Sequence, residues 1–164
     1  MQQTAELLER ELEKYRKLEK NLAFRFSIVN KMLEQQASDL LAETPLKLTG
    51  FRILKIIETF DALSVSDVSR HMMFDRAQIS RSVVQLAELG LVEFKGDSRS
   101  KLKKIVVLSD KGRELMLKLN PIFEKRQSDI EAALGSETLS SVWDAISKLS
   151  RHLDIVNSNS SRNP

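Results

Sequence analysis

The stretch DRAQISRSVVQLAELGLV, residues 75–92, decides the fold and raises the question of function. It predicts a helix that begins at an aspartate N-cap and ends at Gly90, because glycine adopts the left-handed conformation that closes a helix at no steric cost. At about 100° per residue, Ile79, Val83 and Leu86 fall on one side of this helix. These three aliphatic residues predict the face that packs on a core.

The opposite side of the same helix has short and mostly uncharged side chains, where a solvated helix would usually carry lysine and glutamate. Its members are Ala77, Gln78, Ser80, Arg81, Val84, Gln85 and Glu88. The major groove of B-DNA admits a helix whose outward side chains let the backbone approach closely. Glutamine can pair with adenine, arginine with guanine, and a small apolar group with a thymine methyl. The face therefore favours DNA reading, with packing against another protein element as the alternative; Val84 and Glu88 are not explained by base reading.

The neighbouring segments predict a winged helix. Before residue 75, Ser64 and Asp67 have the spacing of a capping box at the start of a short helix, VSDVSRHM, which a tight turn separates from the next helix. After Gly90 the period changes to two in LVEFKG and KKIVVLS, which predicts a β-hairpin around the polar loop GDSRSKL. Two helices joined by a tight turn and followed by a hairpin describe a winged helix-turn-helix.

The hairpin carries a cluster of basic residues in a chain whose net charge is only +3. Asp97 is the single acid among Lys95, Arg99, Lys101, Lys103 and Lys104. Such a local cluster indicates an anionic partner at one patch, and an arginine at the tip would suit the negative potential of a narrow minor groove. The alternative is an ordinary solvated hairpin.

The rest of the chain predicts helices. Residues 5 to about 42 have helical periodicity, charged in the first half and apolar in the second, so that a partner subunit is the natural cover for the apolar half. After a loop at Pro45, Thr49 is the expected N-cap of the helix FRILKIIETF. Ser109 is expected to cap a helix that runs past Pro121, and an amphipathic helix follows before a disordered tail at 157–164.

Composition excludes several classes of protein. The chain of 164 residues has no cysteine and two histidines, so disulfides, thiolate catalysis and cysteine-ligated metals are ruled out and no metal-binding spacing occurs. No apolar run is long enough to span a membrane and the N-terminus has no signal-peptide core, which makes a cytoplasmic protein the expectation. There is no nucleophile with a base, no paired acids on a recognisable loop and no phosphate-cradling glycine loop, so neither an enzyme nor a cofactor is expected.

These residues resemble the MarR family of bacterial transcription regulators over nearly the whole chain. The family's recognition stretch is matched by Asp75-Arg76, by Ile79-Ser80-Arg81 and, at the same spacing, by Gly90-Leu91-Val92. Leu46 to Thr49 looks like the family's entry signal, and LSDKGRELM (108–116) looks like its signature after the wing. Each motif alone is weak, but the ordered and correctly spaced set is fairly specific.

The resemblance implies a mainly α fold with a small β-hairpin wing. One MarR-like domain would cover residues 1–156, with a winged helix-turn-helix lobe at about 46–112 and dimerisation helices at about 5–42 and 113–156. It also implies an obligate dimer held by the first and last helices, a pseudo-palindromic double-stranded DNA operator, and a cleft for a small, often aromatic, anion.

Roles follow for individual residues. Gln78, Ser80 and Arg81 are the expected base contacts, with Ala77 and Gln85 on the same face, whereas Arg76 and the wing lysines Lys95, Lys101 and Lys103 serve phosphates. The wing arginine departs from the family pattern, because Leu102 occupies the matching position and Arg99 lies three residues farther from the motif. We interpret this as a longer wing in which Asp97 orients Arg99; Lys101 or Lys103 could make the minor-groove contact instead.

Two further residues are candidates for an effector. Arg25, a cation within an apolar helix, is expected to extend its charged end to solvent or to pair across a dimer, with contact to a ligand carboxylate as the alternative. His71, at the end of a short helix, suits a surface or capping role better than ligand contact.

The sequence thus predicts a dimeric, sequence-specific DNA-binding transcription regulator, a repressor released by a small ligand. The rival function is a winged helix used for protein contact or non-specific DNA binding without an effector.

Overall fold

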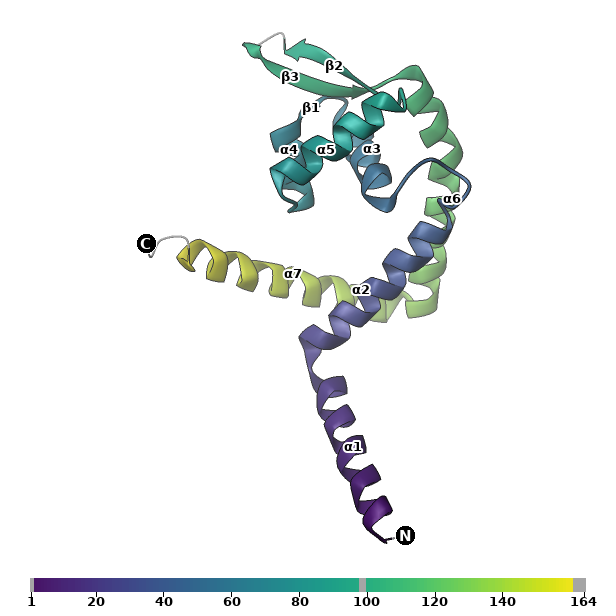
Figure 1. The fold of residues 1–164 in the computed structure, drawn as a ribbon, viewed down its shortest axis with the longest axis vertical. Helices are drawn as coiled ribbons and strands as arrows, with labels where there is room; N and C mark the ends of the chain where they lie inside the picture. Colours follow the sequence, from purple (N-terminus) through teal and green to yellow (C-terminus); the bar gives the residue numbers. More distant parts are fainter. Residues whose placement is uncertain (1, 98–99, 161–164) are drawn as a thin grey trace. The chain divides into compact units, whose positions relative to one another are not determined.

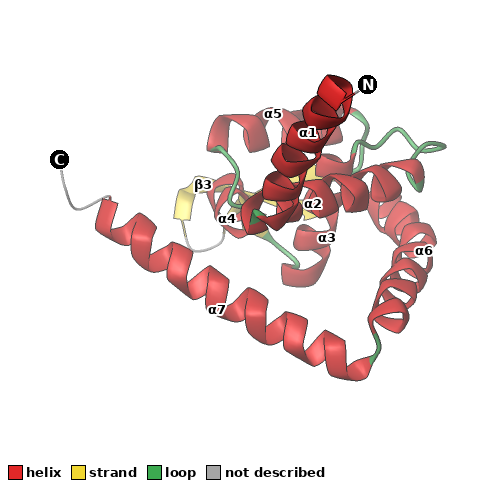
Figure 2. Ribbon diagram, turned by 90° about the horizontal axis from the view of Figure 1, so that it is seen from below, coloured by secondary structure: helices red, strands yellow, loops and turns green. Residues whose placement is uncertain are grey.

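The computed structural model describes residues 2–97 and 100–160, with side chains described for 7–96 and 105–154. In chain order the elements are α1 Gln2–Lys20, α2 Leu22–Asp39, α3 Leu48–Phe60, β1 Leu63–Ser64, α4 Val65–Met72, α5 Arg76–Glu88, β2 Val92–Asp97, β3 Ser100–Leu108, α6 Asp110–Leu134 and α7 Ser136–Ser160 (Figure 1). They fall into two compact units, Met1–Met116 and Leu117–Pro164, with the boundary inside α6. The mainly α fold with a small β wing is confirmed (Figure 2).

The first unit is built around the winged-helix lobe, the predicted segment 46–112. Its core residues are fully or almost fully buried and come from each helix and from both long strands: Ile53, Leu54, Ile57, Val68, Ile79, Val83, Leu86, Leu91, Val92, Val106 and Leu108. Helices α3, α4 and α5 contact one another, α3 also contacts β3, and α5 contacts β2. Helix α5 therefore contacts two helices and the base of the hairpin.

The sheet has the order β1-β3-β2, with both pairs antiparallel. In the hairpin Val92 pairs with Leu108 and Gly96 with Lys104, after which the register shifts so that Asp97 pairs with Ser100. The strands therefore extend into the segment predicted as loop. Strand β1 was not predicted, because two residues are too short to show an alternating pattern; Leu63 pairs with Val106 on the outer edge of β3.

The prediction of one helix from 5 to about 42 is wrong, because the chain breaks at Asn21. This residue has an extended backbone, and its side-chain Oδ1 accepts a hydrogen bond from the Phe24 amide at 2.9 Å, which caps a new helix. The apolar period continues through the break, so spacing alone could not reveal it.

Two predictions of where a helix begins or ends are also wrong. Thr49 lies inside α3, whose N-cap is Lys47 without a side-chain hydrogen bond. Thr44 uses its hydroxyl in the preceding turn instead, accepting from the Leu46 amide at 3.2 Å. At the other end α7 continues to Ser160, so residues 157–160 of the predicted disordered tail are helical, and 161–164 lie outside the described residues.

The predicted caps of α4 and α6 are confirmed. Ser64 Oγ accepts from the Asp67 amide while the Asp67 carboxylate accepts from the Ser64 amide, which completes the capping box. Ser109 Oγ accepts from the Gly112 amide at 2.9 Å in the first turn of α6. Helix α6 continues through Pro121.

Candidate nucleic-acid interface

Helix α5 is capped at both ends as its sequence predicts. Asp75 Oδ1 accepts from the amides of Ala77 and Gln78 at 2.9 and 3.0 Å. At the other end Gly90 has φ 72°, and the amides of Gly90 and Leu91 donate to the carbonyls of Ala87 and Leu86 in a Schellman motif. The helix therefore has fixed ends within the lobe.

The two sides of α5 differ as the sequence predicts. Ile79 and Val83 are fully buried and Leu86 is 3% exposed. Every candidate contact residue on the other side is exposed: Arg76, Ala77, Gln78, Ser80, Arg81 and Gln85. Val84, at 46% exposed, and Glu88 are also open. Within the first unit no described element covers the outer face, so packing of this face against another part of that unit is not supported.

Three hydrogen bonds to main-chain carbonyls hold the C-terminal end of α5 against the start of α6. The Ser109 hydroxyl donates to the Gly90 carbonyl at 2.6 Å, and the Ser109 amide donates to the Leu91 carbonyl at 3.1 Å. Lys111 Nζ donates to the Leu89 carbonyl at 2.7 Å, where a cation also suits the helix dipole. The motif at 108–116, which the sequence indicates only through a family resemblance, therefore has a structural role.

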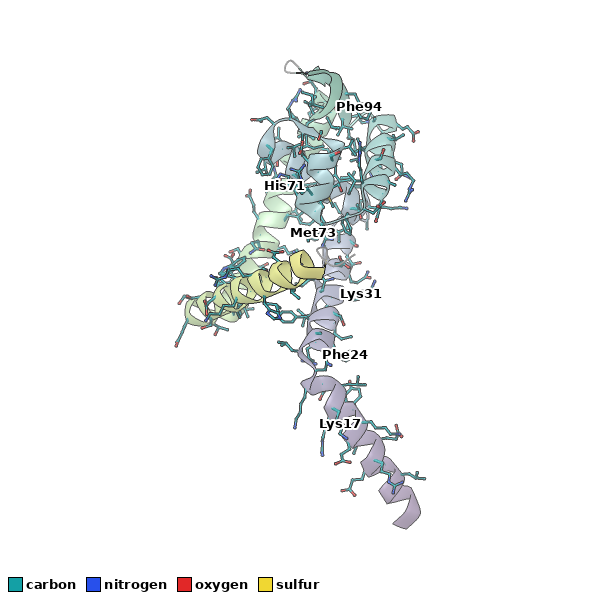
Figure 3. The ribbon with its side chains drawn as sticks, turned by 90° about the vertical axis from the view of Figure 1, so that its left-hand side faces the viewer. Lys17, Phe24, Lys31, His71, Met73 and Phe94 are labelled. Carbon is teal, nitrogen blue, oxygen red and sulfur yellow. The ribbon has the colours of Figure 1, made fainter. Side chains whose placement is uncertain are left out.

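The wing follows directly from this network. Lys95 is exposed on β2, and Phe94 beside it is 44% exposed (Figure 3). Arg99 lies outside the described residues. Asp97, Lys101 and Lys103 belong to the strands, but their side chains lie outside the described set. The roles of these four residues therefore remain predictions.

The two effector candidates have separate contacts. Arg25 Nη1 lies 3.8 Å from Glu19 Oε1, and both side chains are about half exposed, so the ion pair bridges the break between α1 and α2. The His71 ring of α4 stacks on the Phe60 ring of α3, with the ring centroids 4.5 Å apart. A surface role for His71 agrees with its exposure.

One ion pair between distant segments was not predicted. Arg52 Nη1 on α3 lies 3.0 Å from Glu34 Oε1 on α2, and both side chains are about one third exposed. It connects α2, which has exposed apolar side chains, with α3 of the lobe. The pair is separated by 18 residues, so no local spacing rule could have found it.

Several large apolar side chains of the helices outside the lobe are uncovered. On α2 they include Leu22, Phe26, Val29 and Met32; in the second unit they include Leu117, Trp143 and Leu153, which is 50% exposed. Exposed large apolar side chains that recur along one helix, as on α2, indicate an interaction site. No helix in the described part of the chain has the length and hydropathy needed to cross a membrane.

Comparison of the fold with solved structures gives many similar chains, although no family model and no curated protein matches the sequence. MepR of S. aureus, solved in complex with DNA, has a TM-score of 0.77 at 17% identity, covering 82% of this chain and 98% of MepR. BpsR of Bordetella bronchiseptica, whose DNA binding is regulated by 6-hydroxynicotinic acid, has a TM-score of 0.72 at 18% identity, covering 80% and 94%.

A MarR/EmrR family regulator from Acinetobacter sp. ADP1 has a TM-score of 0.73 at 21% identity, covering 79% of this chain and 92% of that one. The chain thus has the fold of MarR family transcriptional regulators, as its motifs predict. At these identities the likeness concerns the fold, and function has to be argued from the chain's own surfaces.

Proposed function

We propose that this chain is a MarR family regulator that binds double-stranded DNA as a homodimer in the cytoplasm. The observation that carries the proposal is the exposed outer face of α5, whose side chains other than Arg76, Arg81 and Glu88 are uncharged, on a helix fixed at both ends. The small side chains of Ala77 and Ser80 let the backbone approach base edges closely, and Gln78 and Arg81 are long enough to reach them. The DNA complex of the structurally similar MepR supports the same use of the fold.

Contacts divide between bases and phosphates. Arg81, Ser80 and Gln78 are proposed to read base edges, with Ala77 and Gln85 lining the groove. Arg76, in the first helical turn, and the wing lysines are proposed to bind phosphates, which sets the register and makes affinity fall with salt. Arg99 at the wing tip, oriented by Asp97, is proposed to enter the minor groove.

The dimer is proposed from the uncovered apolar surfaces of α2 and of the second unit. Two recognition helices related by a two-fold axis read half-sites about 34 Å apart, which is why a pseudo-palindromic operator is expected. An effector that binds better to another spacing of these helices would shift the population away from the DNA-competent dimer. We therefore propose a repressor that is released by a small ligand.

A small aromatic acid is the proposed effector class, and the regulation of BpsR by 6-hydroxynicotinic acid supports it. Arg25 is the proposed carboxylate partner, because its ion pair with Glu19 is long and solvent-exposed and an anion could replace it. His71 is the second candidate, through its open stacked ring.

Selection of bound sites from random duplex DNA tests the proposal. We expect one enriched pseudo-palindrome, a footprint limited to that site, and loss of the footprint with one member of a panel of aromatic acids. Sequence-independent protection, unchanged by every acid, would instead establish the rival function of non-specific DNA binding without an effector. Absence of any DNA binding would leave the winged helix as a protein-contact module.

A further inference from the structure

Helix α1 has no partner along its length within the described part of the first unit. Its contact of note is with α2, at the joint around Asn21, and each of its described side chains, residues 7–20, is exposed (Figure 3). Leu8, Leu12 and Tyr15 form one stripe and are 63%, 47% and 62% exposed. An isolated helix of 19 residues with such a stripe gains little stability from propensity alone.

The stripe has coiled-coil spacing. Leu8, Leu12 and Tyr15 are separated by four and three residues, so they occupy alternating d, a and d positions of a heptad. Glu11 then takes a g position and Arg16 the following e position, on opposite flanks of the stripe. Lys17 lies on the far side of the helix from Leu8, about 180° away.

From this pattern we propose that α1 pairs with α1 of a second copy as a parallel, in-register coiled coil. Parallel pairing makes three successive apolar layers from Leu8, Leu12 and Tyr15. It also places Glu11 of each copy beside Arg16 of the other, because g and the next e position face each other across a parallel seam. Stripe and flanking charges therefore specify the same partner.

Antiparallel pairing of two α1 helices brings the same side chains into less favourable contacts. The antiparallel register that stacks Leu8 on Leu12 brings Glu9 beside Glu9 and Glu11 beside Glu11. The register that separates these like charges places Leu8 against Glu19 instead. In the parallel pair Glu19 takes the next a position and faces Glu19 of the second copy at the end of the seam, where Arg25 of each chain provides an opposite charge.

The pairing adds a contact to the proposed homodimer, and it rests on that dimer for bringing the two short helices together. Three apolar layers are too few for a stable coiled coil at low concentration, whereas tethering raises the effective concentration to about the millimolar range. The experiment therefore measures two quantities, the native mass of the full chain and the cross-linking of α1. A protein that is dimeric but does not cross-link through α1 would contradict the coiled coil and leave the dimer intact.

Single cysteines give a direct test, since the full chain has none of its own. Residues at d positions of a parallel pair lie within the Cα separation of about 4.4–6.8 Å that a disulfide spans. Under mild oxidation the Leu8→Cys protein should form a covalent dimer at least about tenfold faster than the Lys17→Cys protein, whose thiol lies on the outer face. Equal rates for the two variants, in a protein of dimeric native mass, would overturn the proposal.

A charge exchange provides an independent readout. Glu11→Arg should slow cross-linking of Leu8→Cys several-fold, and adding Arg16→Glu should restore it. Within one helix Glu11 pairs with Lys14 at 2.6 Å, and the double variant does not restore that pair, so rescue would indicate a contact with the second copy. Failure of the double variant to restore the rate, or selective cross-linking of Leu8→Cys with Glu19→Cys chains, would refute parallel pairing.

Discussion

Replacement of Gly112 with alanine should destabilise the winged-helix lobe by about 2–4 kcal/mol, through overpacking and the loss of a helix cap. Gly112 is buried in the first turn of α6, where a methyl group would overlap the carbonyl oxygen of Leu91. The same group would lie 3.1 Å from the Leu91 carbonyl carbon and 3.4 Å from Ser109 Oγ. The two Leu91 atoms belong to the backbone, and Ser109 Oγ is held by its hydrogen bonds to Gly90 and Gly112.

The size of the effect follows from what has to shift. Moving α6 away from Leu91 strains a packed site, for which overpacking costs about 1–3 kcal/mol. The movement also lengthens the bond from the Gly112 amide to Ser109, and losing such a cap costs about 1 kcal/mol. Alanine recovers at most about 1 kcal/mol of helix propensity, less in a first turn.

Urea unfolding followed by circular dichroism measures this effect. With a slope of about 2 kcal/mol per molar urea, the middle of the usual range, the midpoint should fall by about 1–2 M. Gly96→Ala is the matched control, because nothing lies within 4 Å of a Cβ placed there, and its midpoint should stay close to that of the parent. A Gly112→Ala midpoint equal to that of Gly96→Ala would show that the contact between α6 and Leu91 is not a constraint on this fold.

Three further predictions concern the DNA interface. Arg81→Ala should cost about 1–3 kcal/mol of operator affinity and relax preference at one base position, whereas Arg76→Ala should weaken all sequences alike and reduce the salt slope by about 1; equal loss on operator and random DNA would assign Arg81 to phosphate. Asp75→Ala removes the acceptor of two amides and should cost about 0.5–2 kcal/mol of stability in urea unfolding, and an unchanged midpoint would contradict a capping role. Arg99→Ala should weaken specific binding markedly in a mobility-shift assay while the native mass stays that of the dimer; an unchanged operator affinity would exclude Arg99 from the groove.

Short-range chemistry accounts for the parts of the fold that the sequence predicts well. Asp75, Ser64 and Ser109 each cap a helix because an oxygen on a short side chain reaches amides two or three residues ahead, which is a local property. Gly90 closes α5 for an equally local reason. The buried triad Ile79, Val83 and Leu86 follows from helical period, and the exposure of the opposite face follows from the same geometry.

The errors arise where a local signal was ambiguous or the partner was distant. Asn21 interrupts a helix whose apolar period continues through it, and Thr49 has cap-like chemistry but lies one residue inside a helix that begins without a side-chain cap. Strand β1 exists because β3 offers it an edge, and the Arg52–Glu34 pair exists because α2 meets α3. Neither contact produces a local sequence pattern from which it could be predicted.

The exposed surfaces of this chain differ in chemistry, and the difference separates their partners. The outer face of α5 carries mostly polar side chains, and the helix is fixed by the buried side chains on its other face. Such a surface suits a groove of fixed shape and offers a protein partner little apolar area. The faces of α1 and α2 expose leucine and phenylalanine, which gain free energy only when covered by other apolar groups. Substitutions on the two sets should therefore be separable in effect. Arg81→Ala should change operator affinity without changing cross-linking through Leu8→Cys, whereas Glu11→Arg should change cross-linking and leave the choice of operator bases intact. If Glu11→Arg altered the base preference itself, α1 would have to act on the recognition helix directly, and the division of the molecule into a DNA-reading surface and a self-pairing surface would be wrong.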